Sequence, residues 1–112
     1  MILRPMSHNY DAQRRETFNT FRDMPKGQKK LPDRAEVDFL FYPEEHDANY
    51  PALMKALTAK GFRCARDEEL VVATVGPIIV AAESIWSHER VATEVALAYD
   101  FYPDGWDLGL DG

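Results

Sequence analysis

The chain has 112 residues, of which 46% are apolar and 12% aromatic, enough for one folded domain with its own core. No apolar run reaches the roughly 20 residues of a membrane-spanning helix, and the first ten residues lack the apolar centre of a secretory signal. The net charge of −6 divides unevenly. Residues 1–34 carry eight Lys or Arg and four carboxylates, whereas residues 35–112 carry five and fifteen. Such an acidic body repels nucleic-acid phosphates and attracts basic protein surfaces.

Residues 1–34 are expected to form a basic N-terminal tail. Within it, "DAQRRETFNTFRDM" predicts a short helix with Asp11 as its cap and with Phe18 and Phe21 on one side. The following "PKGQKKLPDR" places prolines and a glycine inside a basic run, which predicts a linker. We therefore expect the folded domain to span residues 35–112.

The first element of this domain is a predicted strand, "AEVDFLFY". Its side chains alternate, which is the period of a strand. One face carries Val37, Phe39 and Phe41, and the other carries Asp38, Leu40 and Tyr42. Pro43 is expected to end the strand.

The next segment, "HDANYPALMKALTAKG", changes to a helical period. Its apolar residues Tyr50, Leu53, Met54 and Leu57 follow the i, i+3, i+4, i+7 pattern. Asp47 or Asn49 can cap the helix, and Gly61 is suited to its C-terminal end. This is the best-defined predicted helix.

Two short strands, "FRCAR" and "LVVATV", follow and predict a hairpin. We expect Gly76 and Pro77 to end the second of these strands, so that "IIV" leads out of the sheet.

A second helix is predicted in "ESIWSHERVATEVALAYDF", with Ser84 as its cap. Its predicted apolar face consists of Ile85, His88, Val91, Ala92, Val95 and Tyr99. Trp86 faces Arg90 and Leu97 on the other side, where the i, i+4 spacing allows a cation–π contact with Arg90.

The chain then reads "YPDG", which predicts a type I turn, and "WDLGL", which alternates as a last strand. Trp106, Leu108 and Leu110 share one face of this strand, and Asp107, Gly109 and Asp111 share the other. The alternation favours a core position for Trp106, whereas its acidic surroundings favour a partner contact, and both interpretations stay open.

The predicted order is β-α-β-β-α-β, which indicates a ferredoxin-like α+β sandwich with an antiparallel sheet and both helices on one face. In that plan the last strand lies beside the first. The triplet Phe-Tyr-Pro occurs at the end of the first strand and just before the last one. We therefore expect Tyr42, Pro43, Glu44 and Glu45 to lie near Tyr102, Asp104 and Trp106.

The segments "VDFLFYPEE", "ALMKALTAKGFRC" and "YPDGWDL" resemble the bacterial regulator of ribonuclease activity B, over about residues 35–110. The most specific match is Tyr102, Asp104, Gly105 and Trp106. The family is ferredoxin-like and acidic, and its members bind ribonuclease E and inhibit its RNA cleavage. The resemblance implies a cytoplasmic, non-enzymatic regulator with a basic protein partner, in the first instance ribonuclease E.

Catalytic residues, metal ligands and cofactors are not expected. Cys64 is the only cysteine, which fits a reducing cytoplasm. His88 and Glu89 begin like a zinc-protease helix, but Ala92 occupies the place of the second ligand. A hydrolase that uses His88 and Glu89 is therefore the least favoured hypothesis.

The predicted partner-binding residues combine aromatic and acidic side chains, which suit a basic protein surface. They are Tyr42, Glu44, Glu45, Tyr102, Asp104, Trp106, Asp107 and Trp86. The alternative function is a small-molecule-binding or self-associating homo-oligomeric module that uses Leu40, Tyr42 and Trp86. Direct RNA binding by the open sheet face is not expected, because acidic residues on that face repel phosphates.

Overall fold

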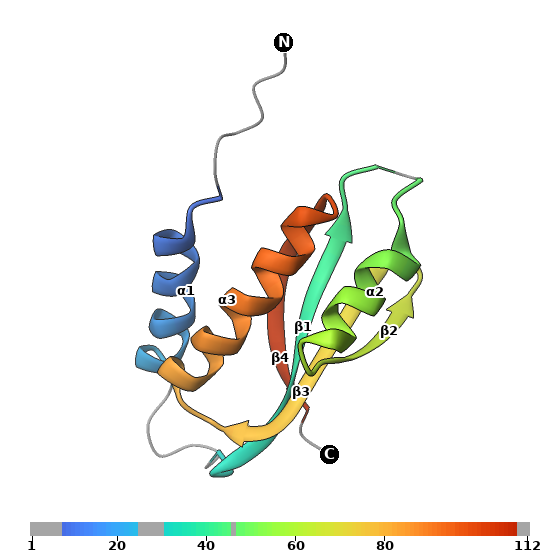
Figure 1. The fold of residues 1–112 in the computed structure, drawn as a ribbon. Coiled ribbons are helices and arrows are strands. Elements are labelled where there is room, and N and C mark those ends of the chain that lie inside the picture. Colours follow the sequence, from blue (N-terminus) through green and yellow to red (C-terminus); the bar gives the residue numbers. More distant parts are fainter. Residues whose placement is uncertain (1–7, 25–30, 46, 110–112) are drawn as a thin grey trace.

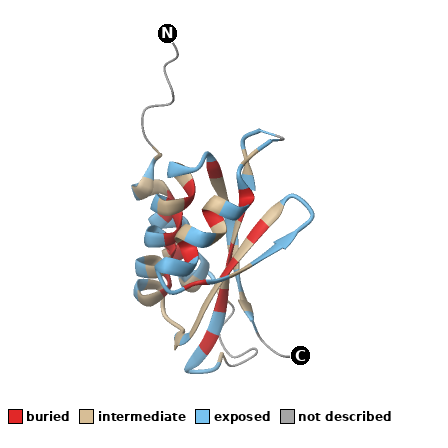
Figure 2. Cartoon of the chain, turned by 45° about the vertical axis from the view of Figure 1, so that its right-hand side comes forward, coloured by how far each residue is buried: buried red, intermediate tan, exposed pale blue. Residues whose placement is uncertain are grey.

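The computed structural model describes residues 8–24, 31–45 and 47–109. These residues form three helices and four strands (Figure 1), in the order α1 (Tyr10–Arg22), β1 (Arg34–Pro43), α2 (Tyr50–Ala59), β2 (Arg63–Asp67), β3 (Leu70–Ile79), α3 (Ala82–Ala98) and β4 (Phe101–Gly109). The strands form one antiparallel sheet with the order β2-β3-β1-β4. The helices cover one face of the sheet and leave the other face open (Figure 2). The fold is therefore α+β, with a layer of helices on an antiparallel sheet. None of the described helices is long and apolar enough to cross a membrane.

β1 lies in the centre of the sheet and confirms the predicted alternation. Val37, Phe39 and Phe41 are at most 1% exposed and face the helices. Asp38 and Tyr42 face the open side, where they are half-buried and exposed, respectively. The period of two arises because successive side chains of a strand point to opposite faces.

α2 confirms the predicted helix and selects one of its two candidate caps. The Asn49 side chain accepts a hydrogen bond from the backbone N–H of Ala52 at 3.1 Å. Leu53 and Leu57 are fully buried in the core below the helix. Gly61 has a φ of +98°, a left-handed conformation that glycine adopts without strain at the end of a helix.

β2 and β3 form the predicted hairpin, but the prediction that β3 ends at Gly76 is wrong. β3 continues to Ile79, and Ile78 pairs with Ala35 of β1 after a register shift. The bulge holds residue 76 at a φ of +120°. Glycine adopts this conformation easily, whereas a residue with a Cβ would be strained. Pro77 is tolerated because β2 pairs with β3 only as far as Thr74, so no β2 partner needs its missing N–H.

α3 occupies the predicted segment, but its predicted apolar face is wrong in part. Its buried residues are Ile85, Glu89, Ala92, Thr93 and Ala96. Val91 and Tyr99 are each 37% exposed, and the residue at the N-cap is Ala81, not Ser84. The buried face of α3 differs from the predicted apolar face because α3 lies between α1 and α2 and packs against both (Figure 1).

α1 confirms the predicted N-terminal helix, although Asn9 and not Asp11 caps it. The Asn9 side chain accepts a hydrogen bond from the N–H of Ala12 at 2.9 Å. Gln13 and Thr17 are buried against α3. α1 therefore packs against the elements of residues 35–112 through these side chains.

β4 begins at Phe101, so the prediction of a separate turn at "YPDG" is wrong. Tyr102 and Pro103 pair with Tyr42 and Phe41 of β1, and Asp104 and Gly105 stay within the strand as an irregularity in this pairing. The predicted alternation after Gly105 is confirmed as far as Gly109, and Leu110 and Asp111 lie outside the described residues.

Candidate functional site

The two Phe-Tyr-Pro segments meet at one end of the sheet, as the sequence predicts. Tyr42 of β1 pairs in register with Tyr102 of β4, and their ring centroids are 6.0 Å apart. The Tyr102 hydroxyl donates a hydrogen bond to Oε1 of Glu44. Glu45 follows in the exposed loop after β1. The expected proximity of Tyr42, Glu44 and Tyr102 is therefore confirmed, and their role in binding a partner stays a prediction.

Two aspartates face each other on the open side of the same strand pair. Asp38 of β1 and Asp107 of β4 are register partners. Thr74 donates a hydrogen bond to Oδ1 of Asp38 at 2.6 Å, but no described Lys, Arg or His forms an ion pair with either aspartate. Like charges directly opposite each other destabilise an antiparallel pair. Among the described residues this acidic pair has no cationic partner, and it lies on the same face of the sheet as Tyr42 and Tyr102, four residues away along β1.

A β-bulge in β4 positions Asp104. Phe39 pairs with Trp106 and Phe41 pairs with Pro103, so Asp104 and Gly105 together lie opposite a single residue, Leu40. Gly105 has a φ of +96°, a conformation that glycine adopts without strain and that accommodates the extra residue of the bulge. Asp104 is exposed at the bulge and, with Asp107, is one of two carboxylates on the edge strand β4.

The two tryptophans do not join this surface. Trp106 lies on the helical side of β4, where its ring stacks on Phe21 of α1 with 5.8 Å between centroids. Trp86 belongs to α3, which covers the same helical side of the sheet (Figure 2). The spacing allows a contact of Arg90 with Trp86, but the Arg90 guanidinium lies over the Tyr10 ring instead. The eight predicted residues therefore belong to two different faces.

A buried polar cluster that the sequence did not reveal lies where α1, α3 and β4 meet. It consists of Gln13, Thr17, Glu89, Thr93 and Trp106. Thr17 donates to Oε1 of Glu89 at 2.5 Å and accepts from Nε1 of Trp106 at 3.1 Å. The spacing of Glu89 could have indicated its burial. It is four residues after Ile85 and three before Ala92, so it lies on the apolar stripe of α3.

Gln13 completes this network. Its Nε2 donates to Oε2 of Glu89 at 3.2 Å and to Oγ1 of Thr93 at 2.9 Å, while its Oε1 lies 2.7 Å from Nε2 of His8. All described partners of the Glu89 carboxyl are therefore neutral.

Glu89 is 5% exposed, and its surroundings change its acidity. Burial raises the pKa of the Glu89 carboxyl to about 7, and the negative charge of Glu16 adds to the rise. The hydrogen bonds from Thr17 and Gln13 act in the opposite direction because they stabilise the carboxylate. Glu89 thus titrates near neutral pH.

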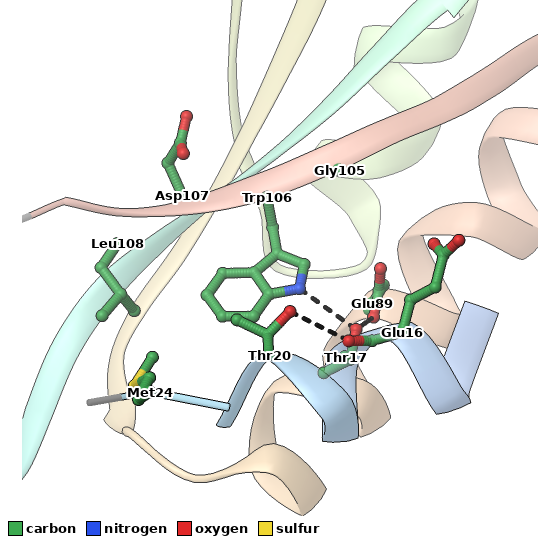
Figure 3. Close-up of a pocket in the computed structure, with 9 residues that line it drawn as sticks. All are labelled: Glu16, Thr17, Thr20, Met24, Glu89, Gly105, Trp106, Asp107 and Leu108. Carbon is green, nitrogen blue, oxygen red and sulfur yellow. Dashed lines mark hydrogen bonds between the residues drawn. The ribbon is translucent and has the colours of Figure 1, made fainter. Parts of the chain in front are cut away.

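A groove of about 490 Å³ opens above this cluster, between α1 and β4 (Figure 3). It is lined by Glu16, Thr17, Thr20, Met24, Glu89, Gly105, Trp106, Asp107 and Leu108. Figure 3 shows the side chains of Trp106 and Leu108 on the α1 side of the strand and Asp107 pointing away from them. The groove therefore combines an aromatic wall with two carboxylates, Glu16 and Glu89.

The other residues considered for catalysis make structural contacts. Nδ1 of His88 lies 2.8 Å from the backbone oxygen of Ser84, one turn earlier in α3. Burial raises the pKa of the Cys64 thiol, which disfavours the reactive thiolate. Among residues 8–24, 31–45 and 47–109, no three His, Cys, Asp or Glu side chains gather in a way that could hold a metal ion.

Comparisons with known proteins assign no family to the chain. No protein-family model and no curated protein matches it.

Proposed function

We propose that this chain is a non-enzymatic regulator that binds a basic protein surface through the open face of its sheet. The partner we propose is a ribonuclease E-type endoribonuclease in the cytoplasm, whose RNA cleavage the protein inhibits. The observation that carries this proposal is the pairing of Asp38 with Asp107 on the face that also carries the Tyr42–Tyr102 pair, four residues away along β1. A pair that costs stability in the free protein is expected where a binding partner compensates it.

The proposal also assigns the fold to the ferredoxin-like class. Read from its other edge, the observed strand order is β4-β1-β3-β2, with every neighbouring pair antiparallel. Together with the element order β-α-β-β-α-β after α1, this supports the assignment. The resemblance to the regulator of ribonuclease activity B supports the choice of partner.

The chemistry of the open face favours a protein partner over the other candidates. Phosphates are repelled by Asp38, Asp104 and Asp107, which argues against RNA. Two copies stacked through their open faces bring these carboxylates together, which argues against self-association there. A basic protein surface places cations against the aspartates and buries the apolar area of Tyr42 and Tyr102.

A cleavage assay tests the proposal. The initial rate of a purified ribonuclease E-type endoribonuclease on a fluorescent RNA oligonucleotide is measured against increasing concentrations of this protein. We expect saturable inhibition that weakens as salt is raised, because salt screens the exposed charges. If the cleavage rate stays unchanged and no complex forms at low salt, the endoribonuclease is not the partner.

A matched pair of double variants locates the surface. Asp38→Asn with Asp107→Asn removes two charges from the open face, and Asp11→Asn with Glu94→Gln removes two exposed charges from the helices. We expect the first variant to inhibit at least about tenfold more weakly, since a charge-assisted contact contributes about 1.5–3 kcal/mol. We also expect it to unfold with a free energy up to about 1 kcal/mol higher than that of the parent. Equal inhibition by both variants would exclude the open face.

A further inference from the structure

The groove between α1 and β4 has the size and lining of a binding site. Its volume of about 490 Å³ falls in the range of pockets that hold small ligands. Met24, Trp106 and Leu108 provide apolar surface, and Thr20 provides a hydroxyl at the wall. The buried polar cluster around Glu89 forms part of its lining. This inference is independent of the proposed function, because it concerns the helical side of the sheet and not the open face.

The charges of the groove are unbalanced. A buried carboxylate is normally paired with a cation, because desolvating an unpaired charge is costly. Within the part of the chain that the structure describes, Thr17 and Gln13 are the donors to Glu89, and these two bonds use only part of the acceptor capacity of its two oxygens. Glu16 is exposed beside it and forms no ion pair with a described residue. No Lys or Arg is among the described residues that line the groove.

We propose that this groove binds an organic cation with an apolar stem, an alkylguanidinium or alkylammonium group. The cation lies against the carboxylates of Glu89 and Glu16, and the stem packs along Trp106 and Leu108. A guanidinium or ammonium group supplies the positive charge that Glu89 lacks, and the indole wall favours a cation at its face. The same chemistry is presented by a free alkylamine or by the side chain of a Lys or Arg of another protein.

Titration of the full chain with n-butylguanidinium chloride tests this site. The NMR signal of the Trp106 indole N–H is the reporter, because Nε1 bonds to Thr17 at the groove. Trp86, the second of two tryptophans, is the internal control, and Trp86→Phe assigns the two signals. We expect a saturable shift of the Trp106 signal with n-butylguanidinium. Sodium chloride at equal ionic strength and n-butanol, a neutral molecule with the same stem, are expected to give no saturable shift.

Charge variants test the role of the carboxylates. We expect Glu89→Gln and Glu16→Gln each to weaken n-butylguanidinium binding, Glu89→Gln by at least about tenfold. Glu94→Gln, on the exposed side of α3, is expected to leave it unchanged. The exposed Glu16 keeps the test valid if Glu89→Gln disturbs the fold. Binding that is equally tight in the Glu89→Gln, Glu16→Gln and parent proteins would overturn the proposal, as would a saturable shift of the same size with n-butanol.

The pH dependence gives a second readout. Burial raises the pKa of the Glu89 carboxyl to about 7, so binding should strengthen between pH 6 and pH 8 as Glu89 ionises. Among the described residues, the other ionisable groups near it are Glu16 of α1 and His8, which contacts Gln13. Arg90 of α3 lies over Tyr10, and Asp107 of β4 points away. Binding that weakens over this pH range would contradict an ionised Glu89 as the acceptor.

A blocked peptide separates the two sources of the cation. If acetyl-Gly-Arg-Gly-amide shifts the Trp106 signal as n-butylguanidinium does, the groove accepts a side chain of a protein. If only n-butylguanidinium binds, the ligand is a free small cation. Failure of both compounds to give a saturable shift would overturn the proposal, whatever the outcome of the endoribonuclease assay.

Discussion

Glu89→Gln should remove most of the pH dependence of stability between pH 5 and pH 8. In the folded protein, burial raises the pKa of the Glu89 carboxyl from the ordinary value of 4.5 to about 7. The folded state therefore binds this proton more tightly than the unfolded state does. The resulting stabilisation is fully present below pH 4.5 and is lost as the pH rises through about 7. Well above pH 7 the loss is complete, and the contribution of Glu89 to the free energy of unfolding no longer changes with pH.

The size of the effect follows from the pKa difference. One unit of pKa corresponds to about 1.36 kcal/mol, so ionisation of Glu89 lowers the free energy of unfolding by about 3 kcal/mol in total. Between pH 5 and pH 8 the expected decrease is about 2–3 kcal/mol, since part of it has already occurred at pH 5. A glutamine cannot ionise and lacks this decrease.

The substitution also changes one hydrogen bond. The oxygen of the new side-chain amide still accepts from Thr17. The NH₂ group of the same amide faces Nε2 of Gln13, which is also a donor, so the Gln13 amide must turn to present its oxygen. This cost does not depend on the charge of residue 89. The free energies of unfolding of parent and variant are therefore compared over a range of pH. The change in their difference with pH reports the ionisation of Glu89, whereas the difference at a single pH also contains the altered hydrogen bond.

Urea unfolding of both proteins at several pH values, followed by tryptophan fluorescence, gives the required free energies. We expect Glu89→Gln to gain about 2–3 kcal/mol relative to the parent between pH 5 and pH 8. A difference that stays constant over this range would refute the account of Glu89 as a buried, neutral-pH carboxyl.

Three further substitutions test the hydrogen bonds of the cluster and the bulge in β3. Thr17→Val keeps the shape of the side chain but removes the donor to Glu89. We expect the free energy of unfolding to fall by about 2–4 kcal/mol at pH 8 and by less at pH 5, measured in the same urea series. Equal losses at the two pH values would contradict a hydrogen bond to a carboxylate. Gly76→Ala should destabilise more than Gly61→Ala, because a Cβ at Gly76 meets the Ile78 nitrogen at 2.8 Å whereas one at Gly61 meets no atom within 4 Å. Both carry the strain of a positive φ, about 1–2 kcal/mol, so similar losses in thermal unfolding would disprove the steric argument.

Local patterns predicted those elements that bury a single, regularly spaced face. β1 has a core face and an open face, so its alternation was sufficient to assign Val37, Phe39 and Phe41 to the core. α2 covers the sheet with one face, and the Asn-x-Pro start and Gly61 mark its ends. The proximity of Tyr42 and Tyr102 could be predicted because it follows from the neighbouring positions of β1 and β4 alone.

The remaining features depend on contacts between distant segments. α3 contacts α1 as well as α2 and the sheet, so its buried face includes Glu89 and Thr93, which a single apolar stripe does not predict. Gln13 and Thr17 read as exposed in an isolated helix, because polar residues are buried only where specific partners satisfy them. The bulge at Gly105 was hidden because "YPDG" has the composition of a turn.

β4 separates the two proposed sites. Its side chains alternate, so Tyr102 and Asp107 face the open side, whereas Trp106 faces α1 and the groove. A partner on the open face therefore need not touch Glu89, and a cation in the groove need not touch Asp107. At physiological salt, exposed charges are screened beyond about 8 Å. Loss of inhibition in the open-face variant with intact n-butylguanidinium binding, and the reverse pattern in Glu89→Gln, would show two independent sites. Parallel loss of both activities in either variant would mean instead that one ligand spans the β4 edge.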